Sequence, residues 1–189
     1  MRKTIRKPSG NYAFIDSQNL NMTTQKLGWK MDWQKFRRFL ADKYEVKKAF
    51  MFIGYVPENE DLYEKMNEAG YAVVLKPTFD MTRPRPEEKP TKDESEEKKP
   101  VKGNIDADLV LWAMKELKNY EKAVIVSDDG DFYSLVEHLA ERGRLLKLLT
   151  PSSHYSRLFN KFDNFIERLD QHRRELAYRD YKKKPRPQK

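Results

Sequence analysis

Short apolar segments alternate with helical patterns along most of this chain. Five segments are short and apolar, as buried strands are, and they occupy residues 12–15, 49–56, 71–75, 123–126 and 145–149. In the segments between and after them, apolar residues recur at helical spacing. This spacing predicts helices at residues 32–44, 59–69, 105–117, 132–142 and 163–169.

The alternation of strands and helices predicts an α/β protein with a single parallel sheet. Strands that are apolar along their whole length are typical of a parallel sheet whose two faces are both covered by helices. Crossover connections in such sheets are right-handed, which restricts the topology. We therefore predict a three-layer fold with about five parallel strands in the common order 3-2-1-4-5 and helices on both faces.

Composition divides the chain into one folded domain and several polar extensions. Of the 189 residues, 38% are hydrophobic and 36% are charged, and the formal net charge is +8. Residues 80–101 combine prolines and charges of both signs with almost no apolar side chains, which predicts a flexible loop inserted in the domain. Basic residues dominate both ends, so we expect an N-terminal arm at 1–10 and a C-terminal tail at 171–189 around a domain at 11–170.

The residue types present argue against several classes of function. The chain has no cysteine, which excludes disulfides and thiolate zinc sites, and its three histidines are scattered. No apolar run approaches the ~20 residues that a membrane span needs, so we expect a cytoplasmic protein without a membrane partner. The chain contains no GxxxxGK[ST] or GxGxxG motif, so we expect no nucleotide cofactor. The basic balance instead favours nucleic acid as a partner.

Aspartates follow the ends of two predicted strands and open a predicted helix. Asp16 ends the first strand, and Asp129 and Asp131 follow the fourth. Asp106 and Asp108 open the helix after the charged loop, and Asp106 shares the apolar face of that helix. In an open parallel sheet, ligands bind beyond the carboxyl ends of the strands, at the point where the strand order reverses. We therefore expect Asp16 and Asp129 to lie side by side.

Several carboxylates at one crevice favour a bound divalent cation. Without one, the carboxylates repel each other and one of them takes up a proton. Oxygen ligands without histidine or cysteine suit Mg²⁺ or Mn²⁺. Each aspartate also has a simpler interpretation, because Asp106 and Asp131 occupy first helical turns while Asp16 and Asp128 could form turns. The occurrence of three clusters at matching ends of the sheet favours the metal site.

Three segments resemble the motifs of a known family. IDSQNL, KGNIDADL and IVSDDGDF are similar to the three motifs of NYN domains, in the LabA-like branch of the PIN-like nucleases, and the resemblance covers residues 11–169. It implies a Rossmann-like PIN fold, an acidic pocket holding Mg²⁺ or Mn²⁺, and hydrolysis of phosphodiester bonds, usually in RNA. The family's acidic residues correspond to Asp16, Asp106, Asp129 and Asp131, and its polar residues correspond to Asn19 and Ser127.

Two positions depart from the family pattern. Asp128 stands where the family often has glycine, and Trp112 stands where many members carry a further acid. Asp108 is a candidate to replace that acid in part. The departure at Trp112 bears on whether a second metal binds.

These features predict a metal-dependent nuclease that cleaves single-stranded RNA. In this hypothesis Asp16, Asp106 and Asp129 hold one cation, which activates water for in-line attack. Asp131 supports a water ligand or a second cation, and Asp108 is an additional candidate ligand.

The substrate contacts are predicted from residue type and position. The candidate substrate-binding residues are Asn19, Ser127 and Lys102, with Lys76 as a further contact to the RNA backbone. Three aromatic residues could stack bases, although a core role is the favoured interpretation for each: Tyr155, Phe79 and Trp29.

Other readings of the same residues stay open. One is an RNA-binding and partner-recruiting module with weak or no catalysis. Another is a phosphatase or nucleotide hydrolase that uses the same carboxylates, although Gln18 stands where a haloacid-dehalogenase-type enzyme would have a second aspartate. A homodimer is compatible with each of these readings.

Overall fold

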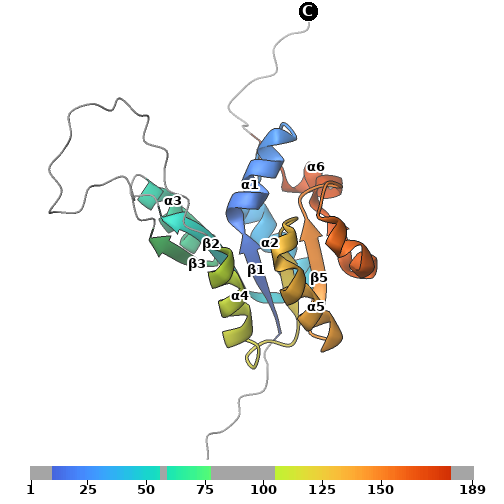
Figure 1. Cartoon of the computed structure of the whole chain (residues 1–189). Helices are drawn as coiled ribbons and strands as arrows, with labels where there is room; N and C mark the ends of the chain where they lie inside the picture. The colour runs from blue at the N-terminus through green and yellow to red at the C-terminus, as the bar shows by residue number, and fades with distance from the viewer. Residues whose placement is uncertain (1–9, 56–58, 78–104, 180–189) are drawn as a thin grey trace, which may run out of the picture.

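Six parallel strands form the centre of the molecule, with helices on both faces (Figure 1). The computed structural model describes residues 10–55, 59–77 and 105–179. Residues 1–9 of the predicted arm at 1–10, the predicted loop at 80–101 and the last ten residues of the predicted tail lie outside this range, as do Lys102 and Phe79. The sheet order is β3-β2-β1-β4-β5-β6, which confirms the predicted order of the first five strands and adds a sixth.

The strands lie close to the segments that the apolar pattern predicts. Their bounds are β1 (Asn11–Asp16), β2 (Val46–Tyr55), β3 (Tyr71–Pro77), β4 (Ala123–Val126), β5 (Leu145–Thr150) and β6 (Ile166–Arg168). Every neighbouring pair is parallel, and β1 lies between β2 and β4 in the middle of the sheet.

The helices alternate with these strands along the chain. They are α1 (Ser17–Lys26), α2 (Trp33–Tyr44), α3 (Glu60–Glu68), α4 (Asp106–Lys115), α5 (Tyr133–Glu141) and α6 (Arg173–Leu176). The 3₁₀ segments η2 (Gly130–Phe132), η3 (Arg157–Phe165) and η4 (Leu169–His172) also form part of the described chain. Among the described residues, no helix is both long and apolar enough to cross a membrane.

Alternating side chains divide the core into two layers. Ala13 and Ile15 of β1 belong to the layer that packs beneath α1 and α2, whereas Phe14 belongs to the layer beneath α4 and α5. This division follows from strand geometry, since successive side chains point to opposite faces. The ring of Phe14 stacks on that of Phe50 in β2, with centroids 5.4 Å apart. Both faces of the central strands are therefore buried, as their apolar composition predicts.

The prediction of a helix at residues 163–169 is wrong. The segment instead ends η3, continues as the edge strand β6 and enters η4. Ile166 pairs with Leu148 and Arg168 with Thr150 of β5. The strand is three residues long and carries two charged residues, so it lacks the apolar run that marks the central strands. A long-range pairing with β5 decided its conformation, and that pairing leaves no local signal in the sequence.

Helix α1 is an element that the apolar pattern does not predict. Its sequence, SQNLNMTTQK, is mostly polar, and Leu20 and Thr24 are among its few buried side chains. Asp16 caps its first turn by accepting a hydrogen bond from the Asn19 backbone N–H at 3.1 Å. An acidic N-cap of this kind stabilises the start of a helix whose own amphipathicity is weak.

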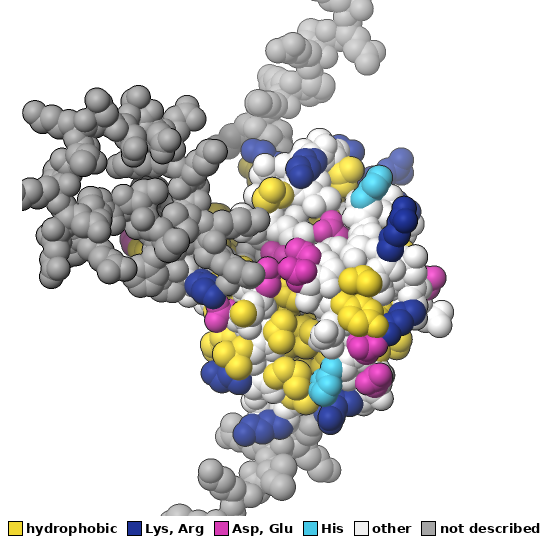
Figure 2. Space-filling view, in the orientation of Figure 1, with side chains coloured by type: hydrophobic (Ala, Val, Ile, Leu, Met, Phe, Trp, Pro, Cys, Tyr) yellow, Lys and Arg dark blue, Asp and Glu magenta, His cyan; other side chains and the backbone are white. Residues whose placement is uncertain are grey.

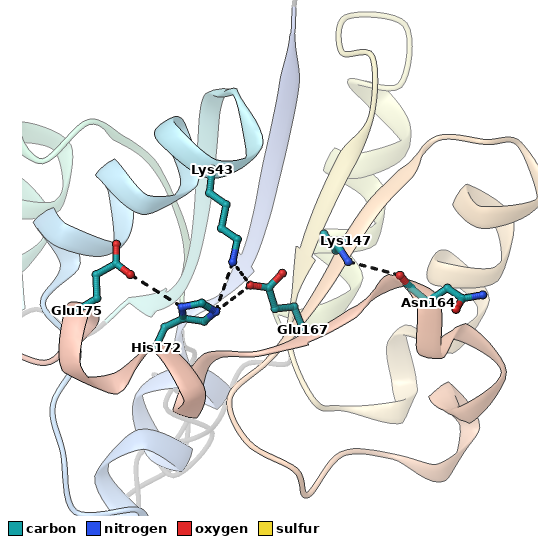
Figure 3. Close-up of polar contacts among 6 residues, drawn as sticks. All are labelled: Lys43, Lys147, Asn164, Glu167, His172 and Glu175. Carbon is teal, nitrogen blue, oxygen red and sulfur yellow. Dashed lines mark hydrogen bonds and ion pairs between the residues drawn. The ribbon is translucent and has the colours of Figure 1, made fainter.

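A polar cluster fastens the edge strand to α2 and η4 (Figure 3). Glu167 of β6 forms an ion pair with Lys43 of α2 and accepts a hydrogen bond from His172 at 2.8 Å. His172 also lies 3.9 Å from the Glu175 carboxylate, and its ring lies 5.0 Å from that of Phe39. These contacts hold a strand that is too short to be stabilised by its pairing alone.

Candidate active site

The candidate site lies where β1 and β4 end side by side. Ile15 pairs with Val126 in the parallel register, so Asp16 and Ser127 follow at the same edge of the sheet. Strand order reverses at this point, because β2 and β3 lie on one side of β1 while β4 and β5 lie on the other. Parallel sheets of this kind bind ligands at such a reversal. The predicted meeting of the first and fourth strands is confirmed.

Asp16 is almost fully buried, with 5% of its surface exposed. Its Oδ1 accepts a hydrogen bond from the Asn19 backbone N–H at 3.1 Å, and its Oδ2 accepts one from the Ser127 hydroxyl at 3.2 Å. Each carboxylate oxygen has a second lone pair that these bonds leave available. Asp16 is therefore held in place while it keeps some capacity to accept further bonds.

The electrostatic surroundings of Asp16 disfavour its charge. Burial, the largest effect, raises the pKa of this carboxyl from 3.8 to about 6. The negative charges of Asp106 and Asp129 raise the pKa further, while the hydrogen bonds from Asn19 and Ser127 lower it. A divalent cation at this position would remove the repulsion among the carboxylates. The raised pKa thus marks the place where positive charge would be stabilised.

Three further carboxylates converge beside Asp16. Asp106, Asp129 and Asp131 each have a carboxylate oxygen within 4.8 Å of the others. Asp106 is the first residue of α4, whereas Asp129 caps η2 by accepting a hydrogen bond from the Asp131 backbone N–H at 3.0 Å. The group joins two segments far apart in the sequence. Figure 2 shows acidic side chains gathered near the middle of this face, with lysines and arginines around its rim.

A cleft of about 450 Å³ opens over Asp16, Asp106 and Asp129. Its lining residues are Asp16, Gln18, Asn19, Met22, Thr23, Lys26, Ile105, Asp106, Asp128 and Asp129. Helix α1 forms one wall, and the sequence interpretation missed that wall because it assigned no helix to residues 17–26. The capping Asp16 followed by Leu20 and Thr24, four residues apart, was the only local signal for this helix.

Asp128 is held by α1 and lies beside the acidic group. Its Oδ1 accepts a hydrogen bond from the Asn19 side-chain amide at 2.6 Å, and its backbone N–H donates to Asn19 Oδ1 at 3.3 Å. Thr23 adds a longer hydroxyl contact at 3.4 Å. This reciprocal pairing ties the loop after β4 to α1. The departure from the family pattern at Asp128 therefore contributes a connection between two walls of the cleft.

Several of the other predicted site residues have partners within the chain or lie in the core. Asp108 forms an ion pair with Lys76 at 2.9 Å and is not part of the three-carboxylate group found among the described residues. Ser127 is 0% exposed, and its hydroxyl bonds to Asp16 and to the Asp129 backbone N–H. Trp29, with 6% exposure, is a core residue, as the favoured interpretation held.

Trp112 occupies a packed position on α4. Its ring lies 5.2 Å from that of Phe50, and the Lys115 ammonium group lies 5.0 Å from the Trp112 ring. The side chain is half-buried against the layer of the core beneath α4 and α5. Trp112, at the position where many NYN domains carry an acid, thus packs against Phe50 of the sheet.

The donor set fits a hard divalent cation. All candidate ligands are carboxylate oxygens, which suit Mg²⁺ and Mn²⁺, and Asp106, Asp129 and Asp131 are close enough to share one ion. The buried, charge-crowded Asp16 is the second observation in favour, because the surrounding protein supplies too little positive charge to hold its pKa low. An acidic cluster of this kind could bind a metal ion.

The fold and the acidic cleft define a PIN-like protein of the NYN type. The NYN domain model matches residues 12–170, and the chain belongs to the NYN domain family. This family consists generally of nucleases with a Rossmann-like fold that use divalent metals. The predicted family and the predicted three-layer fold are both confirmed.

Two individual proteins illustrate how far this likeness extends. The chain is 25% identical over 170 residues to the low amplitude and bright protein LabA of Synechococcus elongatus, covering 87% of this chain and 86% of that protein. A crystal structure of a protein of unknown function from Vibrio parahaemolyticus superimposes with a TM-score of 0.67 at 19% identity. That match covers 94% of this chain and all of the other, and it supports the fold alone.

Proposed function

We propose that this protein is a metal-dependent ribonuclease that hydrolyses phosphodiester bonds in single-stranded RNA. The observation that carries the proposal is the meeting of Asp106, Asp129 and Asp131 beside the buried Asp16, in a cleft at the strand-order reversal of an NYN domain. The net charge of +8 supports a polyanionic substrate, because positive charge elsewhere on the protein would offset the repulsion between RNA and the acidic cleft.

The aspartates have distinct roles in this proposal. Asp106, Asp129 and Asp131 hold the cation, because their carboxylate oxygens lie close enough together to bind one ion. Asp16 adds a fourth negative charge at the base of the cleft, and Ser127 and Asn19 hold its two oxygens in place. When bound, Mg²⁺ or Mn²⁺ would polarise a phosphoryl oxygen and lower the pKa of water.

Asn19, Ser127 and Asp108 take supporting roles rather than contacting the substrate or the metal directly. Ser127 is buried and orients Asp16, and Asn19 joins α1 to Asp128. Asp108 is paired with Lys76, and this ion pair would have to open before either side chain reached RNA or metal. Lys102 remains a proposed contact for the RNA backbone.

The test is hydrolysis of an end-labelled single-stranded oligoribonucleotide with Mn²⁺ or Mg²⁺. We expect Asp129→Asn and Asp106→Asn to lower the rate at least about 100-fold, since loss of a metal ligand costs several kcal/mol in the transition state. Asp42→Asn, on the exposed surface of α2, is the matched control and should cleave like the parent. Equal rates in all four proteins would show that a contaminant cleaves the RNA.

The position of Trp112 supports a second candidate function. The expected extra acid is replaced by a packed ring, and Asp108 does not substitute for it because it pairs with Lys76. A site with fewer free carboxylates favours an RNA-binding module with weak or no turnover. RNA binding without hydrolysis in either metal would select this candidate over the nuclease.

A further inference from the structure

A second pocket adjoins the acidic cleft, between the loop after β4 and the loop after β5. It has a volume of about 640 Å³, within the range of about 300–1,000 Å³ found for ligand sites. Its lining residues are Asp128, Asp129, Gly130, Ser153, His154, Tyr155, Ser156, Arg157 and Asn160. We propose that this pocket is a subsite that binds the nucleotide next to the scissile phosphate of a single-stranded RNA; this rests on the proposed nuclease function.

The pocket and the acidic cleft share one wall. Asp128 and Asp129 line both, so a chain whose phosphate lies at the carboxylates extends directly into the second pocket. The acidic cleft alone offers few groups that could recognise a base or sugar, because most of its polar side chains are carboxylates or are paired with them. Recognition of a neighbouring nucleotide therefore has to come from an adjoining surface.

The loop after β5 is fixed against the active-site loop. The Ser156 backbone N–H donates to the Asp128 carbonyl at 3.1 Å. A Cβ atom on Gly130 would lie 2.5 Å from the Ser156 hydroxyl, so the two loops approach closely and a side chain at position 130 would require Ser156 to shift. Within the loop itself, the Ser152 hydroxyl accepts a hydrogen bond from the His154 backbone N–H at 3.1 Å. A pocket held in this way keeps its shape relative to the carboxylates.

The side chains of this loop have the chemistry that single-stranded RNA requires. Arg157 is exposed, and within the described part of the chain its guanidinium forms no hydrogen bond or ion pair. It is thus available to bind a phosphate, for which its planar fork is well suited. Tyr155 lines the pocket and is partly buried against the core, and Ser153 and Asn160 offer hydrogen-bonding groups for a base edge or a 2′-hydroxyl.

The experiment measures binding of a fluorescent single-stranded oligoribonucleotide to the full chain, over a range of salt concentrations, with Ca²⁺ in place of Mn²⁺ to prevent turnover. Arg157→Ala should raise the dissociation constant about 5- to 10-fold and reduce the slope of log K against log salt by about one, since one phosphate contact is lost. Arg157→Glu should weaken binding further. Arg142→Ala is the matched control, because Arg142 is an exposed arginine at the far end of α5.

The outcomes separate the subsite from the nuclease. If the Arg157 variants bind like the parent with an unchanged salt slope, or if the parent does not bind RNA, the subsite is overturned. Hydrolysis by the parent and by Asp129→Asn, measured with Mn²⁺ on the same RNA and on bis(p-nitrophenyl) phosphate, tests the nuclease independently. Binding that depends on Arg157 without any hydrolysis would support the subsite and reject the nuclease.

Discussion

The Ser127 hydroxyl donates a hydrogen bond to Asp16 Oδ2 at 3.2 Å. The Ser127 hydroxyl oxygen also accepts a hydrogen bond from the Asp129 backbone N–H at 3.1 Å, and Ser127 is 0% exposed. One buried hydroxyl therefore links the end of β1 to the loop that carries Asp129. The relative position of these two aspartates depends on this link, although Ser127 itself has no route to the substrate.

Replacing Ser127 by alanine should impair catalysis through Asp16. The hydrogen bond from Ser127 lowers the pKa of Asp16, so its loss should raise that pKa above about 6 and move the acidic limb of the pH–rate profile to higher pH. The measurement is the rate of RNA hydrolysis as a function of pH. Ser134→Ala, an exposed serine of α5, is the control. An unshifted profile in Ser127→Ala would contradict the role assigned to this hydroxyl.

Asp16→Asn should stabilise the metal-free protein near neutral pH. The pKa of Asp16 is raised from 3.8 to about 6 in the folded state, so the folded protein binds the carboxyl proton more tightly than the unfolded chain does. Ionisation of Asp16 at higher pH therefore destabilises the folded state. The shift corresponds to at most about 3 kcal/mol, and asparagine can still cap α1. Urea unfolding in EDTA should show the gain at about pH 7 and its disappearance as the pH falls toward about 4.

A saturating concentration of Mn²⁺ should reverse this order. The cation stabilises the parent through its carboxylates, and Asp16→Asn gains less from it. A variant that is less stable than the parent in EDTA near neutral pH would show that the charge of Asp16 is already compensated within the protein.

Asn19 and Asp128 should be energetically coupled. Their two hydrogen bonds, at 2.6 Å and 3.3 Å, include one to a charged acceptor, which contributes about 1.5–3 kcal/mol. A double-mutant cycle with Asn19→Ala and Asp128→Ala, followed by urea unfolding, measures the coupling. The exposed pair Asn21 and Gln25 on the same helix, 3.2 Å apart, is the control and should couple by less than about 0.5 kcal/mol. Similar coupling energies for the two pairs would contradict the proposal that Asn19 and Asp128 tie the loop after β4 to α1.

The ion pair of Lys43 and Glu167 should stabilise the edge of the sheet in a pH-dependent way. Burial raises the pKa of Glu167, but its contacts with Lys43 and His172 outweigh that effect and hold the pKa below 4.5. The stabilisation is therefore present above about pH 4.5 and is lost as the pH falls through the lowered pKa. Lys43→Met should cost up to about 1 kcal/mol near neutral pH, discounted because Lys43 is 40% exposed.

Thermal unfolding at neutral and acidic pH provides the measurement for this pair. Lys118→Met, at an exposed lysine in the turn before β4, is the comparison and should change stability little at either pH. A loss in Lys43→Met that persists in acid would assign the effect to the contact of the Lys43 ammonium group with the Phe39 ring and not to the ion pair with Glu167.

The short apolar segments were sufficient to predict the central sheet. Residues 123–126 form β4 as predicted, because a four-residue apolar run between turns has few alternatives in a buried sheet. The same reasoning failed at α1 and β6. Helix α1 is polar and depends on the cap from Asp16, and β6 depends on pairing with β5, so neither has a strong local pattern.

The sequence by itself determined the fold class and the strand ends that carry the aspartates, because apolar periodicity encodes both locally. The strand order was predicted only as the order common to such folds, and the tertiary structure confirmed it. Only the tertiary structure decided that Asp131 joins Asp106 and Asp129, that Asp108 pairs with Lys76 and that Asp128 pairs with Asn19. The reason is physical: the direction of a carboxylate depends on helix caps and on partners from distant segments, and spacing along the chain does not encode either.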